Sequence, residues 1–389
     1  MKKLFLNILF VVLISISANA QDNQNWKWIN QYPQGNALYW VKMWDANTWY
    51  AVGNNGTFMK TTNAGQNWFI NHKSTALLHN GEGATLYSAY FFNLNTGFVV
   101  GANNYSSYSG DCTGGGVYKT TNGGLTFDSV PGFRYDKPIY YYKIIFISNN
   151  IGYIAGNYWE NGVYYPMIYR TNDGGQTWNS IGQNITTQHV KARGIYAWDS
   201  LNVIVCANFG EVYKSTDAGL TWNVYITGNS VDLTQIKFID ANTGFTCGGS
   251  SALRMTSNGG VNWTALANVP NSNNYDMNII NSNGTSIYLT GNNYYLFRTT
   301  NLGTSWDTIK MYQTNPATAN EMYSSDISIT GDTIISVGYF GNINKTIGLN
   351  NYTNISKNIR GGIIYDLWVQ GTGNSNIIAV GNYTSSAIS

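Results

Sequence analysis

The chain is poor in charge, histidine and proline, and each shortage removes a class of function. Only 10% of the 389 residues are charged and the net charge is +2, so no strong field favours nucleic acid or an anionic membrane. The three histidines lack the spacing of a zinc site, and no GxSxG, P-loop or HExxH motif occurs. We therefore expect no metal, no cofactor and no nucleic-acid partner, and nothing in the sequence identifies an enzyme.

Cysteine is also scarce, because three residues are too few for a disulfide framework. Cys206 and Cys247 occupy the same place in successive repeats, within IVCAN and FTCGG. Rotational symmetry would point equivalent side chains in the same sense around a ring, and not at each other. We expect two buried, inert thiols and a reactive Cys112 in a loop.

Long apolar runs are missing, with one exception at the N-terminus. Lys2 and Lys3 precede an apolar run over 4–16, and small residues follow at Ala18 and Ala20. This pattern predicts a cleaved signal peptide over 1–20, because the run is too short to span about 30 Å of hydrocarbon comfortably. We expect a mature domain over 21–389 that is secreted or held in the periplasm or at the cell surface, without a membrane span.

Glycine, tyrosine and an internal repeat are abundant, with 42 Gly and 30 Tyr. An eight-residue motif occurs six times: TTNAGQNW ending at Trp68, TTNGGLTF at Phe127, TNDGGQTW at Trp178, STDAGLTW at Trp222, TSNGGVNW at Trp263 and TTNLGTSW at Trp306. A degenerate seventh copy covers 345–352. Before the motifs lie short apolar strands that end in glycine, such as YAVG at Gly53 and FTCG at Gly248, and further apolar runs lie upstream.

Each repeat therefore predicts four short strands, and such units of about 40 to 50 residues are typical of propeller blades. Inner strands should begin near residues 37, 85, 139, 191, 232, 275, 323 and 363. We expect an all-β single propeller of four-stranded antiparallel blades, with eight blades favoured and seven as the alternative. In the eight-bladed ring, a strand at 26–29 would pair with the incomplete last unit, 363–389, because open sheet edges invite aggregation.

The motif resembles the Asp-box, Ser/Thr-x-Asp-x-Gly-x-Thr-Trp, of the sialidase-type (BNR) repeat propellers. Two copies match it fully, and four carry Asn in place of Asp. The resemblance covers essentially the whole mature chain and is closest to secreted bacterial relatives of the photosystem II assembly and stability factors. It implies that the boxes lie away from the ligand face and have a structural role, carried by Asn63, Gly65, Trp68, Asn122, Gly124, Phe127, Asp173, Gly175, Trp178, Asp217, Gly219, Trp222, Asn258, Gly260, Trp263, Asn301, Gly303 and Trp306.

Simple chemistry supports this structural role. The Asp or Asn side chain would accept backbone N–H groups inside a tight turn, and the glycine would supply a positive φ. The closing Trp or Phe should be buried against the neighbouring blade. Basic residues before the boxes, such as Lys60 and Lys214, should lay their stems over the box aromatic, although a cationic ring for an anionic polymer is an alternative.

Two extended loops offer the best lead to a ligand. They cover 102–116 and 157–166, follow the same strand in adjacent blades, and should project together from one face. An aromatic ridge of this kind suits stacking on sugar rings or gripping a peptide. The candidate ligand-binding residues are Tyr105, Tyr108, Tyr158, Trp159, Glu160, Tyr164 and Tyr165.

The leading hypothesis is a secreted, non-catalytic binding or scaffold propeller whose loop face meets a glycan or a protein. A second is an extracellular glycoside hydrolase, sialidase-like or other, which needs two carboxylates facing one pocket. The six arginines offer no evident sialidase triad, because Arg170 and Arg298 adjoin boxes. A third is an assembly chaperone, by analogy with the photosystem factors, whose recognition residues are rich in arginine. The oligomeric state stays open.

Overall fold

The computed structural model separates the chain into two compact units, Gln31–Gly361 and the pair Met1–Asn30 with Gly362–Ser389. It describes residues 36–388 except 72–77, 80–81, 103–115, 134–138, 186–189, 229, 250–251, 267–276, 284–285, 292–294, 311–323, 331–332, 339–342, 348–350, 355–363, 371–375 and 382–385. The expected signal peptide, the strand at 26–29 and Cys112 lie outside these residues. Across the described part of the chain, no helix is long and apolar enough to cross a membrane.

The larger unit consists of seven four-stranded antiparallel sheets, each built from one contiguous stretch of chain. Blades 1 to 3 comprise β1 (Leu38–Met43), β2 (Trp49–Gly53), β3 (Phe58–Thr61) and β4 (Phe69–Asn71); β7 (Thr85–Phe91), β8 (Gly97–Ala102), β9 (Val117–Thr120) and β10 (Asp128–Ser129); and β11 (Ile139–Phe146), β12 (Gly152–Glu160), β13 (Val163–Thr171) and β14 (Asn179–Ser180). Blade 4 comprises β15 (Gly194–Ala197), β16 (Val203–Cys206), β17 (Glu211–Ser215) and β18 (Asn223–Ile226).

The later blades follow the same order. Blades 5 to 7 comprise β19 (Leu233–Phe238), β20 (Gly244–Gly248), β21 (Leu253–Thr256) and β22 (Thr264–Ala265); β23 (Met277–Asn283), β24 (Ser286–Gly291), β25 (Tyr295–Thr299) and β26 (Asp307–Lys310); and β27 (Ser324–Thr330), β28 (Thr333–Gly338), β29 (Ile343–Ile347) and β30 (Asn351–Asn354). Short additions are the pair β5 (Leu78–His79) and β6 (Glu82–Gly83) and the 3₁₀ turns η2 (Gly182–Asn184) and η3 (Asn208–Gly210). In the smaller unit, β31 (Ile364–Gln370), β32 (Asn376–Gly381) and β33 (Ser386–Ile388) form a three-stranded sheet.

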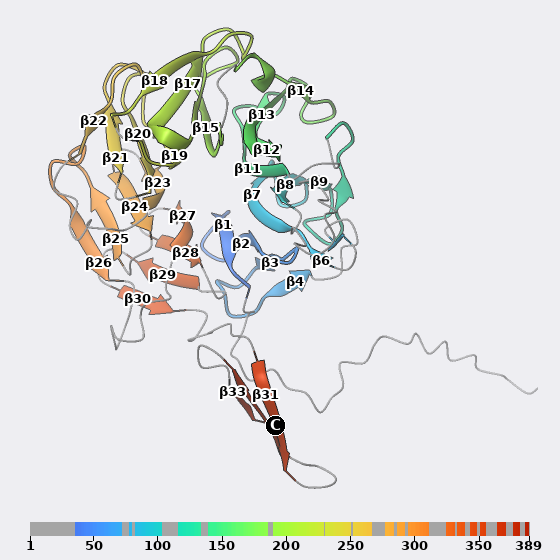
Figure 1. Cartoon of the computed structure of the whole chain (residues 1–389). Helices are drawn as coiled ribbons and strands as arrows, with labels where there is room; N and C mark the ends of the chain where they lie inside the picture. Colours follow the sequence, from blue (N-terminus) through green and yellow to red (C-terminus); the bar gives the residue numbers. More distant parts are fainter. Residues whose placement is uncertain are drawn as a thin grey trace, which may run out of the picture. The chain divides into compact units, whose positions relative to one another are not determined.

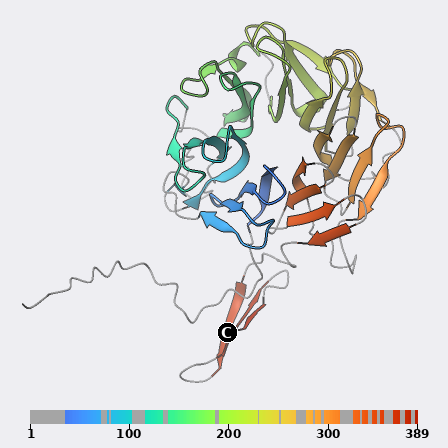
Figure 2. The same ribbon diagram turned by 180° about the vertical axis from the view of Figure 1, so that it is seen from behind.

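The seven blades are arranged in a ring, with the first strand of each blade nearest the centre (Figures 1 and 2). Three of the second strands, β2, β8 and β20, are buried at every residue, which explains their unbroken apolar sequences. The outermost strands β10, β14 and β22 are exposed. Core clusters of buried side chains join each blade to the next.

The expectation of eight blades was wrong, since the ring has seven. Blades 1 and 7 pack directly against each other through a shared core that includes Trp49 and Ile335. The amide of Met43 also donates to Ser328 Oγ at 2.8 Å across this interface. No further blade fits between them, and the strands of 364–388 belong to the other unit. The closing strand expected at 26–29 lies outside the described residues.

The six Asp-boxes have one common geometry, as the sequence predicts. In the third box, Asp173 Oδ1 accepts the amide of Thr177 at 2.9 Å, and Thr171 Oγ1 accepts the amide of Gly175 at 2.9 Å. In the second, Asn122 Oδ1 accepts the amide of Thr126 at the same 2.9 Å. Every box glycine has a positive φ between 80° and 90°. Asn therefore replaces Asp without loss of the turn.

Two expectations for the side chains around the boxes need correction. Phe127 and Trp263 are buried, but the closing tryptophans of the other four boxes are only partly buried. The basic residue before a box does not cover the box aromatic. Lys60 Nζ instead lies 5.1 Å from the ring of Tyr50, its partner on the neighbouring strand, because cross-strand neighbours stand side by side.

Both described cysteines are free and buried, as expected. Cys206 packs in the core between blades 4 and 5, and Cys247 packs in the core between blades 5 and 6. Equivalent side chains thus point the same way around the ring. Burial raises the pKa of Cys206 to about 12 and raises that of Cys247 strongly, so both thiols stay protonated at neutral pH.

Candidate functional site

Irregular residues at the start of the inner strands organise the candidate site. The pairing between first and second strands skips one residue in six blades, and this β-bulge falls at Tyr39, Tyr87, Tyr142, Thr234, Asn278 and Ser325. In blade 4 the corresponding residue is Arg193, directly before β15. A bulge turns its side chain out of the regular alternation, and bulges recur beside functional sites.

Three successive bulge residues and the corresponding residue of blade 4 make an unbroken chain of contacts, which we call the tyrosine crescent: Tyr39, Tyr87, Tyr142 and Arg193. Ring centroids are 5.4 Å apart between Tyr39 and Tyr87, and 5.2 Å apart between Tyr87 and Tyr142. The guanidinium carbon of Arg193 lies 5.7 Å from the centroid of the Tyr142 ring. The crescent therefore connects blades 1 to 4 along the inner strands.

Charges and a fourth tyrosine extend the crescent at its far end. Arg193 Nη2 pairs with Asp232 Oδ2 of blade 5 at 3.1 Å. Tyr140 stacks on Tyr142 with a centroid distance of 5.9 Å and an interplanar angle of 9°. In blades 5 to 7 the bulge positions hold the smaller residues Thr234, Asn278 and Ser325, so tyrosine occupies this position in blades 1 to 3.

The phenols of Tyr87 and Tyr142 remain neutral at physiological pH. Burial raises the pKa of Tyr142 to about 12, although the Arg193 guanidinium opposes this shift. Burial, with the neighbouring Tyr142 and Tyr39, also raises the pKa of Tyr87. Each hydroxyl therefore keeps its proton and can donate as well as accept a hydrogen bond.

The second candidate loop is a continuous hairpin of β12 and β13 and not an irregular loop. Its strands pair as far as Glu160 and Val163, and Asn161 and Gly162 make the turn with φ of 51° and 83°. A two-residue turn with both φ positive fits the right-handed twist of paired strands. The hairpin is therefore a regular two-stranded arm that extends the two central strands of blade 3.

The two faces of this arm carry different aromatics. Tyr158 and Tyr165 are directly opposed and stack at 4.8 Å with an interplanar angle of 14°. Trp159 and Tyr164 are opposed on the other face, and Trp159 is 42% exposed. The structure thus brings five of the predicted residues together, counting Glu160 beside the turn. Tyr105 and Tyr108 lie outside the described residues.

The hairpin and the crescent lie at the same end of the ring. Tyr158 pairs with Ile139, at the start of inner strand β11, whereas the Asp-box of this blade follows Thr171, next to Gly152 at the opposite end. Lys191 links the two groups, because its Nζ lies 4.4 Å from the ring centroid of Tyr164 and it precedes Arg193 by two residues. The box residues are therefore remote from this surface, as the resemblance implies.

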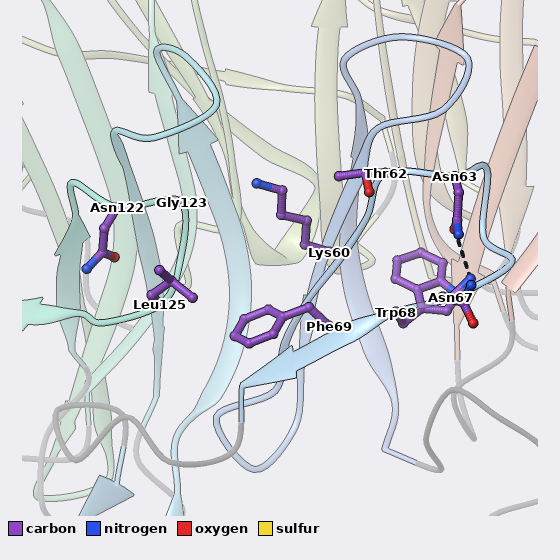
Figure 3. Close-up of a pocket in the computed structure, with 9 residues that line it drawn as sticks. All are labelled: Lys60, Thr62, Asn63, Asn67, Trp68, Phe69, Asn122, Gly123 and Leu125. Carbon is purple, nitrogen blue, oxygen red and sulfur yellow. Dashed lines mark hydrogen bonds between the residues drawn. The ribbon is translucent and has the colours of Figure 1, made fainter.

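A hollow of about 450 Å³ lies at the box end, between the first two boxes (Figure 3). Phe69 and Leu125 face it and are 43% and 58% exposed. Two of its polar side chains already have structural partners: Asn63 accepts the amide of Asn67, and Lys60 lies over Tyr50. The hollow therefore offers a ligand mainly an apolar edge.

Sequence reasoning missed the crescent, although one signal marked it. A Cβ on Gly53, Gly101, Gly156 or Gly248 would collide with a carbonyl oxygen beside the bulge of the inner strand. The glycine that ends each of these four second strands is thus required by the bulge opposite it. Aligning the repeats on this glycine would have placed Tyr39, Tyr87 and Tyr142 in one column.

Known proteins share this architecture. The family of the photosynthesis system II assembly factor YCF48 matches residues 229–346. The structure of YCF48 bound to D1 peptide is 18% identical, with a TM-score of 0.58, and the match covers 82% of this chain and 93% of that chain. YCF48 from Cyanidioschyzon merolae is 14% identical, with a TM-score of 0.56 and coverage of 82% and 98%.

A hydrolase has the same fold over part of its length. The GH74 xyloglucanase from Xanthomonas campestris is 11% identical with a TM-score of 0.65, and the match covers 91% of this chain and 60% of the xyloglucanase. No curated protein sequence matches the chain. At these identities the structural likeness concerns the fold. Together with the family match and the six Asp-boxes, it shows that the chain is a BNR-type β-propeller related to the photosystem II assembly factor family.

Proposed function

We propose that this chain is a binding propeller that holds an extended segment of a protein partner across the tyrosine crescent. The observation that carries the proposal is the contact chain from Tyr39 to Arg193, which joins four blades without a break. Tyrosine and arginine are the residue types enriched in the cores of protein interfaces. They combine a large apolar face with hydrogen-bond donors that a peptide backbone can use.

The spacing of the crescent supports an extended ligand. Its rings follow one another at 5.2–5.4 Å. Side chains on one face of an extended peptide repeat at roughly 6.6 Å, so alternate residues of such a peptide would meet successive rings. The relative named YCF48 bound to D1 peptide is a complex of a similar propeller with a peptide, which favours a protein partner over a glycan.

The chaperone-like role deepens the same proposal, since a chaperone for assembly also holds a segment of its client. The glycoside hydrolase alternative lacks support at the crescent, where the carboxylate of Asp232 is already paired with Arg193. Export of the chain rests on the N-terminal pattern at 1–20 and is part of the proposal. The partner is then a protein met outside the cytoplasm.

The test is selection from a random dodecapeptide library displayed on phage, with the purified chain as bait. Affinities of recovered peptides are then measured by calorimetry for the wild type, Tyr142→Ala and Phe69→Ala. We expect Tyr142→Ala to weaken binding about tenfold or more, as for an interface hot spot, and Phe69→Ala to leave it unchanged. Phe69 is the matched control because it is an exposed aromatic at the opposite end.

Circular dichroism spectra and melting temperatures of both variants check that they remain folded. Tyr142→Phe provides a milder change that keeps the ring and removes only the hydroxyl. Recovery of no peptide, or binding that depends on Phe69 and not on Tyr142, would contradict the proposal. A glycan array probed with the same proteins covers the sugar alternative, and glycan binding lost in Tyr142→Ala would replace the peptide with a sugar.

A further inference from the structure

Three lysines on the inner strands lie just inside the crescent. Lys42 of blade 1 and Lys237 of blade 5 are each the third residue after a bulge, and Lys143 of blade 3 directly follows the bulge at Tyr142. At about 3.3 Å per residue, they lie within roughly 10 Å of the crescent along the same strands. The inner strands of a propeller surround its central channel, so three cations from alternate blades lie on strands that border this channel.

The three lysines act on one another electrostatically. Burial lowers the pKa of Lys237, and the charges of Lys143 and Lys42 lower it further. Blades 1 and 5 lie on opposite sides of the ring (Figure 1), so the interaction between their charges runs across the central channel. A like charge and partial loss of water both oppose the ammonium form.

The contacts of these lysines with described residues offset little of this repulsion. Lys237 Nζ lies 5.7 Å from the Tyr196 ring and Lys42 Nζ lies 5.8 Å from the Trp44 ring. Such cation–π contacts are weak at exposed sites. The ion pairs among the described residues are Arg193–Asp232 and Arg298–Asp307, and neither includes one of the three lysines. The seven inner strands contain these three lysines and one acidic residue, Asp326 of blade 7, so together they carry a net positive charge.

We infer that the segment held on the crescent carries an acidic side chain whose carboxylate enters the axis between Lys42, Lys143 and Lys237. The inference rests on the proposed function, because the crescent supplies the surface along which the segment lies. A carboxylate attached to a bound segment would neutralise the cluster without a separate ligand. Lysine is suited to this task as a compact cation with three donors on a flexible stem.

The dodecapeptide library separates this inference from the proposed function. We expect recovered peptides to share an Asp or Glu at a fixed position relative to an apolar or aromatic residue. Replacing that residue by Asn or Gln should weaken binding to the wild type about tenfold or more. The same replacement should have little effect on Lys237→Met, because the double-mutant cycle isolates the contact between the two charges.

Lys119→Met is the matched control, since it removes one positive charge near the boxes, where Lys119 Nζ lies 5.5 Å from the Phe98 ring. It should retain the full preference for the acidic peptide. Peptides that need Tyr142 but show no acidic preference would overturn this inference and leave the proposed function intact. Recovery of no peptide would overturn both.

A second experiment distinguishes a carboxylate of the partner from a free anion. Inorganic phosphate is titrated against the wild type and Lys237→Met, with the melting temperature as readout. Equal small responses of the two proteins would support a carboxylate delivered by the partner. Saturable stabilisation of the wild type alone would assign the cluster to a free oxyanion and overturn the inference.

Discussion

The guanidinium of Arg193 lies over the ring of Tyr142, with 5.7 Å between the guanidinium carbon and the ring centroid. The same guanidinium pairs with Asp232 at 3.1 Å, so an aromatic face and a carboxylate fix it on two sides. This arrangement joins the aromatic part of the crescent to the charged part. It also makes the planar shape of arginine, and not only its charge, the feature that a partner would meet.

Replacing Arg193 by lysine should therefore weaken peptide binding almost as much as replacing it by alanine, by about tenfold. Lysine keeps the positive charge but has no planar group that can stack on Tyr142 and pair with Asp232 together. Calorimetry with peptides recovered from the library measures the effect. Equal affinities of the wild type and Arg193→Lys would show that charge alone is recognised.

Replacing Lys237 by methionine should stabilise the free protein by about 0.5–2 kcal/mol at neutral pH, the usual range of stabilising substitutions. The pKa of Lys237 in the folded protein is below its ordinary value of 10.5, so the unfolded chain binds this proton more tightly. The penalty is complete below the lowered pKa and is lost as the pH rises from there toward 10.5. If Lys237 had a purely structural role, its replacement by methionine would instead destabilise the protein.

Melting temperatures of the wild type and Lys237→Met between neutral pH and pH 10.5 measure this difference. The charged neighbours that act on Lys237 are Lys143 and Lys42, and Tyr196 lies against it. All three are present in both proteins. The difference in melting temperature between Lys237→Met and the wild type should shrink as the pH rises, whereas Lys119→Met should show no such change. A lower melting temperature of Lys237→Met at neutral pH would contradict the prediction.

Much of the fold could be predicted from the sequence, because each blade is encoded locally. The expected starts of the inner strands at 37, 85 and 139 agree with β1 at Leu38, β7 at Thr85 and β11 at Ile139. Apolar strands that end in glycine mark the buried second strands, and the Asp-box marks the turn to the fourth. These signals are local hydrogen bonds and burial patterns, which sequence periodicity reports directly.

The number of blades could not be predicted in the same way. The segment 364–388 has the same strand and glycine pattern as a blade, including a bulge between Ile364 and Asp366. Whether such a unit joins the ring depends on packing between blades, as between Trp49 and Ile335, and a repeat alone does not specify its neighbours. The crescent was missed because a bulge interrupts the alternation on which strand prediction depends.

Truncating box tryptophans should give unequal losses of stability, in the order of their burial. Trp263 is 9% exposed and its Nε1 donates to Gly260 O at 3.0 Å, so Trp263→Ala should cost about 3–5 kcal/mol. Trp222 is only partly buried, although it donates to Ile181 O at 3.0 Å, so Trp222→Ala should cost roughly 1–3 kcal/mol. Chemical denaturation measures both, and equal losses would show that burial does not set the order.

Replacing Asp173 and Asp217 together by asparagine should flatten the dependence of stability on acid pH and change little at neutral pH. Hydrogen bonds from Thr177 and Thr221 lower the pKa of these carboxyls to about 2. Because their pKa is depressed in the folded protein, their contribution is complete above the ordinary value of 3.8 and is lost as the pH falls through about 2. Asn258 accepts the amide of Asn262 at 2.9 Å without any charge, so asparagine preserves the turn.

The wild type should therefore lose more in melting temperature between pH 4 and pH 2 than the asparagine variant. The control Asp217→Ala should melt lower at every pH, because it leaves the amide of Thr221 without its acceptor. If the melting temperatures of the wild type and the asparagine variant fell equally between pH 4 and pH 2, the two box carboxyls would not cause the loss of stability in acid.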